Sequence, residues 1–308
     1  MTAIIEVEHL RKTYRGTVAV DDVSFAVREG EIFGILGPNG AGKTTTVECL
    51  IGLRRPDGGS ARTLGLDPHA GPAEARELHR VVGSQLQEAA LPAKLTVAEA
   101  IDLYASFYRR PADGDALLHT LGLDDKRDTR FKKLSGGQKQ RLSIALALIG
   151  NPRVAVLDEL TTGLDPAARR ETWGLIEQVR ERGVTIVLVT HFMDEAERLC
   201  DRIALIDRGR VAAEGSPAEV ARQAVGGKRV RFRPSAHFAD AVLTGLPEVG
   251  GLERHGDRIS VTGTGDLANA VILTLDRIGV VAHDVTVEAP NLEDTFLALT
   301  EHAAKEEG

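Results

Sequence analysis

The chain is poor in cysteine and in aromatic residues. Its 308 residues include only two cysteines, Cys49 and Cys200, which cannot form a disulfide framework. Both lie in apolar, helix-like stretches, where a thiol is typical of a buried small side chain. Aromatic residues make up 4% of the chain, which excludes a series of aromatic platforms for stacked bases.

Excess positive charge and long apolar runs are also missing. Lys and Arg number 38 against 45 Asp and Glu, so the net charge is −7, and a surface of this sign does not attract a polyanion over its whole extent. We therefore expect no nucleic-acid partner. No apolar stretch approaches the roughly 18 residues that cross a bilayer, and the first residues lack the pattern of a secretion signal. These absences predict a soluble chain.

Strand and helix patterns fill most of the chain. Within residues 4–35, apolar and polar side chains alternate, which predicts an antiparallel sheet with one wet face. Continuous apolar runs, typical of parallel strands covered on both faces, occupy residues 32–36, 154–157 and 184–189. Helical patterns separate these runs. The predicted fold class is therefore α/β, with a mixed core sheet and an N-terminal antiparallel β subdomain.

The segment at about residues 88–150 is mostly helical and predicts a helical subdomain inserted into this core. Residues 110–114 break it. Its last helix carries one apolar stripe, formed by Leu142, Ala145, Leu146 and Ile149. A hairpin turn is predicted at residues 207–210, and the first domain is expected to span residues 1–226.

Residues 228–308 predict a small C-terminal accessory α+β domain. The patterns give a strand at 230–234, a helix at 238–246, two strands flanking 255–257, a helix at 267–278, a strand at 284–289 and a final helix at 292–302. This region carries no catalytic motif, and its scattered histidines without cysteine do not predict a zinc site. Its role is therefore expected to be packing and not chemistry.

A glycine-rich loop between a predicted buried strand and a predicted helix is the first segment that indicates a binding function. The segment fits the pattern G-x-x-x-x-G-K-[ST] with Gly37, Pro38, Asn39, Gly40, Ala41, Gly42, Lys43 and Thr44, and Thr45 follows it in the helix. Glycines let the backbone N–H groups point at phosphates, and the new helix adds its positive end. Lys43 is expected to bridge the β- and γ-phosphates, and the Thr44 hydroxyl to bind Mg²⁺.

Two acidic residues follow the apolar run that ends at Leu157. Asp158 and Glu159 come at the carboxyl end of a predicted strand, where open α/β sheets bind ligands. Asp158 would hold Mg²⁺ through a water, and Glu159 would orient or deprotonate the attacking water. Alone, two such acids fit helix N-caps equally well, but the phosphate loop in the same chain favours the catalytic roles. His191 follows a third apolar strand, where a lone histidine is usually structural.

A short motif narrows the functional class of this phosphate-loop protein. Leu134, Ser135, Gly136, Gly137 and Gln138 open a predicted helix 20 residues before Asp158. Such a helix start is an anion site with a capping hydroxyl, or simply an ordinary helix cap. The pentapeptide resembles the signature of the ATP-binding-cassette (ABC) ATPases, and the resemblance covers roughly residues 3–225.

The resemblance assigns roles to further residues. It implies that Tyr14 stacks on adenine, that Gln87 reaches Mg²⁺ and the attacking water, and that His191 contacts the γ-phosphate. Gln87 is preferred to Gln85 because it lies four residues after Gly83 and eight before Leu95. Asp165 matches the loop that crosses the dimer interface. The family usually has proline after the acidic pair, whereas this chain has Leu160, and losing a fixed φ is expected to loosen the loop.

Further implications concern partners. Two such ATPases sandwich two ATP molecules with Mg²⁺, the phosphate loop of one facing Ser135 and Gly137 of the other. A homodimer and a separate transmembrane permease are therefore expected, at the cytoplasmic face of the cell membrane. Residues 190–202, 215–219 and 291–297 resemble drug and antibiotic exporter ATPases of the daunorubicin-resistance type. An importer ATPase and a soluble ABC ATPase outside transport remain the alternatives.

Overall fold

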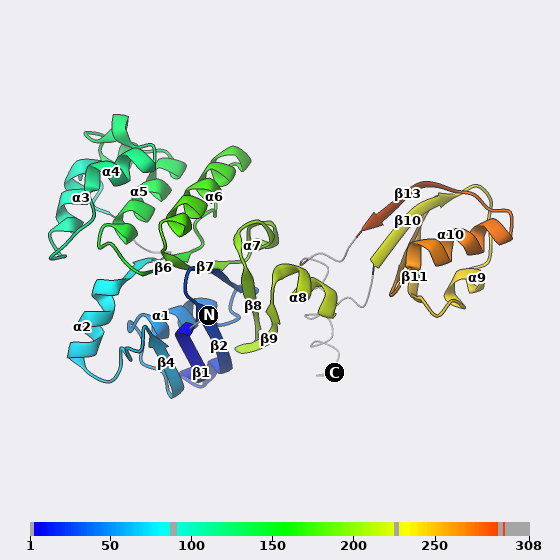
Figure 1. Cartoon of the computed structure of the whole chain (residues 1–308), viewed down its shortest axis with the longest axis horizontal. Coiled ribbons are helices and arrows are strands. Elements are labelled where there is room, and N and C mark those ends of the chain that lie inside the picture. The colour runs from blue at the N-terminus through cyan, green and yellow to red at the C-terminus, as the bar shows by residue number, and fades with distance from the viewer. Residues whose placement is uncertain (1–2, 87–90, 225–227, 289–291, 293–308) are drawn as a thin grey trace. The chain divides into compact units, whose positions relative to one another are not determined.

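The computed structural model describes residues 3–86, 91–224, 228–288 and 292. The chain divides into two compact units, Met1–Pro217 and Ala218–Gly308 (Figure 1). This division lies ahead of residue 226, where the sequence predicts the first domain to end. Among the described residues, no helix combines the length and the hydropathy needed to cross a bilayer.

The first unit is built on one nine-stranded sheet in the order β4-β1-β2-β9-β8-β3-β7-β6-β5. Strands β1, β2 and β4 pair antiparallel, whereas β8, β3, β7, β6 and β5 are parallel neighbours. Their bounds are β1 Ala3–Tyr14, β2 Thr17–Arg28, β3 Ile32–Leu36, β4 Gly58–Thr63, β5 Val82–Gln85, β6 Val154–Asp158, β7 Thr185–Thr190, β8 Arg202–Asp207 and β9 Arg210–Gly215. The predicted mixed α/β core sheet is confirmed.

Burial along the strands follows their apolar patterns. Every residue of β3, β6 and β7 is buried, as expected for parallel strands covered on both faces. In β2, Val23, Phe25 and Val27 are buried, whereas Asp22 and Ser24 are exposed, which confirms the predicted sheet with one wet face. The hairpin predicted at 207–210 joins β8 to β9.

Seven helices accompany these strands in the described part of the first unit. They are α1 Lys43–Leu50, α2 Pro72–Val81, α3 Val97–Ala105, α4 Gly114–Thr120, α5 Gly136–Leu148, α6 Pro166–Glu181 and α7 Met193–Leu199. Figure 1 shows α3, α4 and α5 grouped together, and each contacts the other two. The predicted apolar stripe of α5 is confirmed, because Leu142, Ala145, Leu146 and Ile149 are all buried.

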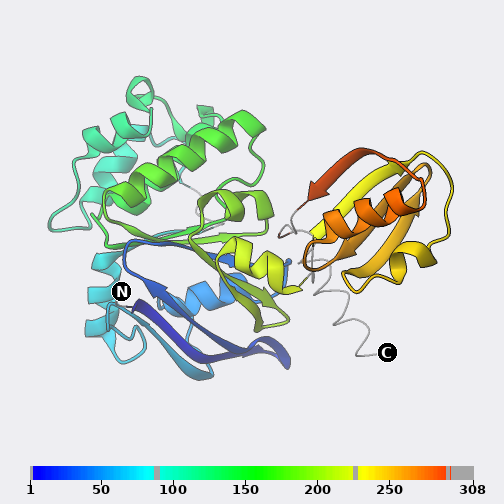
Figure 2. The ribbon, with the colours of Figure 1, turned by 45° about the vertical axis from the view of Figure 1, so that its right-hand side comes forward.

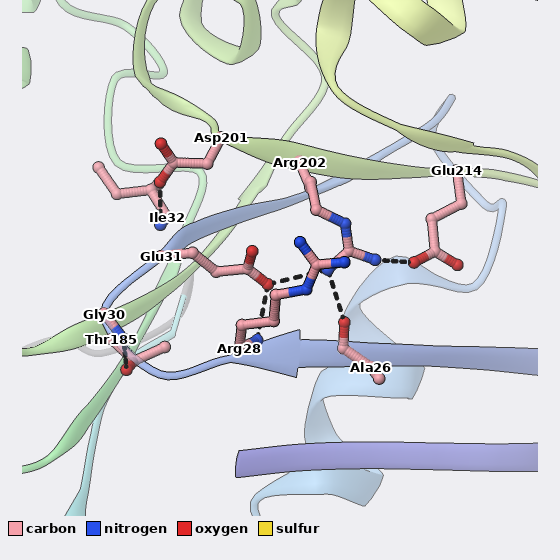
Figure 3. Close-up of polar contacts among 9 residues, drawn as sticks. All are labelled: Ala26, Arg28, Gly30, Glu31, Ile32, Thr185, Asp201, Arg202 and Glu214. Carbon is pink, nitrogen blue, oxygen red and sulfur yellow. Dashed lines mark hydrogen bonds and ion pairs between the residues drawn. The ribbon is translucent and has the colours of Figure 1, made fainter. Parts of the chain in front are cut away.

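A largely buried ion cluster joins the antiparallel and parallel parts of the sheet (Figure 3). Arg202, the first residue of β8, donates from Nη1 to Glu31 Oε1 and to the Ala26 carbonyl oxygen, both at 3.1 Å. Its Nη2 pairs with Glu214 of β9. The guanidinium also lies 5.4 Å from the ring centroid of Phe33. One side chain therefore holds β2, β3, β8 and β9 together.

The second unit is a four-stranded antiparallel sheet in the order β11-β12-β10-β13. Its elements are α8 Pro217–Ala224, β10 Lys228–Pro234, α9 Ala241–Thr244, β11 Val249–His255, β12 Arg258–Gly263, α10 Leu267–Arg277 and β13 Ala282–Glu288. Figure 2 shows α10 against this sheet. Val230 and Phe232 of β10 pack with Val271 and Leu275 of α10 in one apolar cluster.

The strand and helix order predicted for residues 228–288 is confirmed, with one correction. The helix predicted at 238–246 spans only Ala241–Thr244. Phe238 turns its side chain into the core, and its carbonyl oxygen accepts a 2.8 Å bond from Arg254 instead of a helical N–H. Gly245 and Pro247 end the helix early. Of the final helix predicted at 292–302, only Leu292 lies within the described residues.

Candidate functional site

The glycine-rich loop leaves β3 at Leu36 and enters α1 at Lys43, as the sequence predicts. Gly37 has a φ of +151°, and a Cβ atom there would come within 2.1 Å of the Ile206 carbonyl oxygen. Gly42 has a φ of +102°, and a Cβ atom there would lie 2.3 Å from the Ala19 carbonyl oxygen. Both positions therefore require glycine for conformation and for space.

Lys43 points its ammonium group into this loop. Its Nζ donates to the carbonyl oxygens of Gly37 and Pro38, at 2.8 and 2.9 Å. Burial lowers the pKa of Lys43, and the nearby carboxylates of Glu159 and Asp158 oppose that shift. A buried ammonium satisfied only by backbone carbonyls can exchange them for phosphate oxygens, because charge-assisted bonds are stronger.

The loop lines a cavity of about 480 Å³. Its walls come from β1, β2, α1 and the end of β6, so residues far apart in sequence meet here. The lining residues are Tyr14, Ala19, Asn39, Gly40, Gly42, Lys43, Thr44, Thr45 and Glu159. The structure therefore brings Tyr14 and Glu159 to the phosphate loop.

Tyr14 is flanked by two cations that sequence reasoning missed. Lys12 Nζ lies 5.6 Å and Arg54 Cζ lies 5.3 Å from the ring centroid. Lys12 is itself held by Asp57 at 2.8 Å. The Tyr14 hydroxyl is buried and bonds to none of the described residues. The ring, and not the hydroxyl, is thus the feature that this environment holds in place.

Asp158 ends β6 with its carboxylate buried and unsatisfied. The residue is 1% exposed, neither carboxylate oxygen has a full hydrogen bond in the described part of the chain, and the Thr44 hydroxyl and the Lys43 charge only partly offset this burial. Burial and the neighbouring Glu159 carboxylate raise the pKa of Asp158 to about 6, against the opposing charge of Lys43. An orphaned carboxylate near the hydroxyl of Thr44 fits a hard cation such as Mg²⁺. Gln87, the third predicted magnesium residue, lies outside the described residues.

Glu159 and His191 come together although 32 residues separate them. Because β6 and β7 are parallel neighbours, the residues that follow them meet at one edge of the sheet. His191 Nδ1 lies 3.2 Å from Glu159 Oε1. Glu159 itself has a φ of +50°, a left-handed conformation that costs a non-glycine residue about 1–3 kcal/mol. Such strain is typical of functional sites.

The signature residues lie around a different cavity. Ser135 caps α5: its hydroxyl accepts the Gln138 N–H at 3.3 Å, and the Gln138 side chain accepts the Ser135 N–H at 3.0 Å. Asp165 caps α6 with bonds to two backbone N–H groups, and these bonds lower the pKa of its carboxyl. Ser135, Gly136, Gly137, Gln138 and Asp165 all line one cavity of about 380 Å³. The two cavities share no lining residue.

Comparisons with known proteins agree with this geometry. The sequence profile of the ABC transporter family matches residues 20–162. The Nod factor export ATP-binding protein I of Rhizobium etli is 36% identical over 97% of this chain and 94% of its own length. The daunorubicin/doxorubicin resistance ATP-binding protein DrrA of Streptomyces peucetius is 36% identical, over 98% of this chain and 94% of its length.

Solved structures extend the likeness to the fold of the first unit. The cbiO1 protein of Clostridium perfringens, part of the ABC transporter complex cbiONQ, superposes with a TM-score of 0.66 at 29% identity, covering 72% of this chain and 92% of that one. The ATP-binding cassette MJ0796, a dimer bound to ADP and phosphate, has a TM-score of 0.63 at 28% identity, covering 69% and 98%. The chain belongs to the ABC transporter family, as an ATP-binding subunit.

Proposed function

We propose that this chain hydrolyses ATP with Glu159 as the base, and that it powers an exporter through a separate permease. The observation that carries the hydrolysis is the cavity in which Tyr14, Lys43 and Glu159 meet. Tyr14 offers a ring to the adenine, Lys43 exchanges loop carbonyls for phosphate oxygens, and Glu159 accepts the proton of the attacking water. His191, 3.2 Å from Glu159, would then contact the γ-phosphate and hold that carboxylate in place.

Thr44 and Asp158 are the residues that would hold Mg²⁺, with Gln87 as the third. When bound, the ion supplies positive charge to the phosphate oxygens. Asp158 serves this role because its buried carboxylate has no other partner among the described residues. A bound cation would compensate both its burial and the repulsion from Glu159.

A homodimer follows from the separation of the two cavities. The signature cavity is lined by the starts of α5 and α6, and the positive end of a helix favours an anion. It shares no residue with the phosphate-loop cavity, so a second copy is the natural supplier of the opposite wall. The solved MJ0796 cassette is a dimer in its ADP- and phosphate-bound state. ATP would join two copies, and loss of the γ-phosphate would release them.

Export is favoured by relatives that match the whole chain. The Nod factor export and daunorubicin resistance proteins are similar over 97% and 98% of this sequence, so the second unit is included in the likeness. Since no described helix can cross a bilayer, a separate permease would form the path. The cargo class we propose is drugs, antibiotics or other hydrophobic compounds, and the site of action is the cytoplasmic face of the cell membrane.

Hydrolysis is tested with the purified full chain, Mg²⁺ and ATP, by phosphate release and by size-exclusion chromatography. Glu159→Gln should bind ATP but stall, accumulating a dimer, because the amide keeps the shape and loses the base. Lys43→Ala should instead lose affinity for ATP, since the triphosphate then keeps uncompensated charge. Turnover by Glu159→Gln at the wild-type rate would move the base to another residue.

The direction of transport is tested in inverted membrane vesicles that hold this chain together with the permease subunit that co-purifies with it. Daunorubicin is a suitable fluorescent probe, because a relative of this chain is named for resistance to it. An exporter accumulates the probe inside inverted vesicles with ATP, and Glu159→Gln abolishes that accumulation. ATP-dependent release of a preloaded probe from the vesicles would favour the importer. Recovery of the chain in a fraction without membranes would favour a soluble ABC ATPase.

A further inference from the structure

Glu195 is a fully buried carboxylate outside the cavities described above. It lies in α7 with an exposed fraction of 0%. Its Oε1 accepts two hydrogen bonds, from the Thr161 hydroxyl at 2.9 Å and from the Trp173 indole N–H at 3.0 Å. Its Oε2 has no hydrogen-bond partner in the described part of the chain. Burying a carboxylate without a paired cation is costly, so a purpose beyond packing is expected.

The two donors tie Glu195 to the segment that follows the candidate base and to α6. Thr161 follows Glu159 by two residues, and Trp173 lies in α6, whose first turn is capped by Asp165. Glu195 itself follows His191 by four residues, in the helix that begins at Met193. One carboxylate oxygen therefore connects the segment after β6, the segment after β7 and α6.

The backbone at Glu159 needs such support. Its φ of +50° persists only where the surroundings fix it. Its N–H donates to the Val189 carbonyl oxygen at 2.9 Å, and this bond holds the end of β6 against β7. On the loop side stands Leu160, where ABC ATPases usually carry proline. Leu160 is fully buried but does not fix φ as proline does. The Thr161 side-chain bond to Glu195 is a separate restraint on the same loop.

We propose that Glu195, through Thr161 and Trp173, is a positioning residue that holds Glu159 and His191 in their hydrolytic arrangement. This inference rests on the proposed role of Glu159 as the base. Glu195 lines neither of the two cavities described above. It acts by restraining the loop from Glu159 to Asp165, so its loss slows the chemical step and leaves nucleotide binding intact.

The test compares two valine variants of the full chain. Thr161→Val keeps the shape and removes the donor to Glu195. Thr172→Val is the matched control, because Thr172 is similarly buried and adjacent to Trp173, but the bond that its hydroxyl makes among the described residues goes to the Ala168 carbonyl oxygen of its own helix. We expect Thr161→Val to lower kcat by about 10- to 100-fold with the Kd for a fluorescent ATP analogue unchanged, the range for a reacting group displaced by up to 1 Å. Thr172→Val should retain wild-type kcat.

Thr161→Ser keeps the hydroxyl that Thr161→Val lacks, so its kcat should be close to that of wild type. A role in packing alone would not predict this, because serine lacks the methyl group of threonine. Equal kcat in Thr161→Val and wild type would overturn the inference, as would equal losses in Thr161→Val and Thr172→Val. If Thr161→Val does not fold, Trp173→Phe decides, because it removes the second donor: wild-type kcat there overturns the inference, and a lower kcat at unchanged Kd supports it. Absence of hydrolysis in the wild type, or full hydrolysis by Glu159→Gln, refutes the proposed base instead.

Discussion

Replacing Asp158 with asparagine should make the nucleotide-free protein more stable while removing its hydrolysis. The wild-type carboxylate is buried, unsatisfied and next to Glu159, and these surroundings raise its pKa from 3.8 to about 6. At neutral pH the folded chain must therefore keep a charge in a place that disfavours it. Asparagine has nearly the same shape and no charge, so it relieves this cost.

The magnitude follows from proton linkage. A carboxyl whose pKa is higher in the folded state than in the unfolded state binds protons more tightly when folded, so stability falls as pH rises from about 4 to about 6. A rise from 3.8 to about 6 corresponds to about 3 kcal/mol at pH 7, since each tenfold change in proton affinity is about 1.4 kcal/mol. At pH 5 the same linkage gives about 1.6 kcal/mol. Asp158→Asn should gain about these amounts.

Calorimetry at pH 7 and pH 5 measures the effect. A gain of about 3 kcal/mol raises the Tm by about 6–12 °C for a unit of this size, and the difference between Asp158→Asn and wild type should halve at pH 5. Asp165→Asn is the matched control. Its Tm should not rise above that of wild type, because backbone N–H bonds favour the charged form of Asp165 and lower its pKa. A Tm of Asp158→Asn that equals or falls below that of wild type at pH 7 would refute the reasoning.

Tyr14→Ala should weaken ATP binding by about 1–3 kcal/mol in calorimetric titration, whereas Tyr14→Phe should be mild, because stacking needs the ring and the hydroxyl has no partner among the described residues; equal losses in both would place adenine elsewhere. Arg202→Ala leaves Glu31 buried without its cation, and should cost about 3–5 kcal/mol in urea unfolding. Arg153→Ala breaks an exposed ion pair and should cost less than about 1 kcal/mol. A chain of residues 1–226 should keep its ATP affinity and lose transport; loss of ATP binding in a folded 1–226 chain would assign the second unit to the site.

The phosphate loop could be predicted from sequence because its chemistry is local. The loop joins a strand to a helix in consecutive residues, and glycine is required at Gly37 and Gly42 by backbone geometry. The Ser135 cap of α5 is local in the same sense, since its partner Gln138 is three residues away. Patterns of this kind need no knowledge of the tertiary fold.

The neighbours of Tyr14 and the role of Glu195 could not be predicted in the same way. Arg54 reaches the Tyr14 ring across 40 residues, and its position depends on side-chain rotamers and on how β1 and α1 pack. One feature of the sequence could have indicated a role for Glu195: it shares the buried face of α7 with Ala196 and Leu199, and a carboxylate is rarely fully buried. Only the fold shows that its partners are Thr161 and Trp173.

Two of the costs that the structure accepts fall on adjacent residues at one strand end. Asp158 keeps a carboxylate without a partner among the described residues, and Glu159 takes a left-handed backbone conformation that strains a side-chain-bearing residue. Neither feature stabilises the folded chain. A bound cation would compensate the charge of Asp158, and the conformation of Glu159 goes with a carboxylate that lies 3.2 Å from His191 Nδ1. A strained residue keeps its conformation only when its neighbours restrain it. The bond from the Glu159 N–H to Val189 and the bond from the Thr161 hydroxyl to Glu195 supply that restraint.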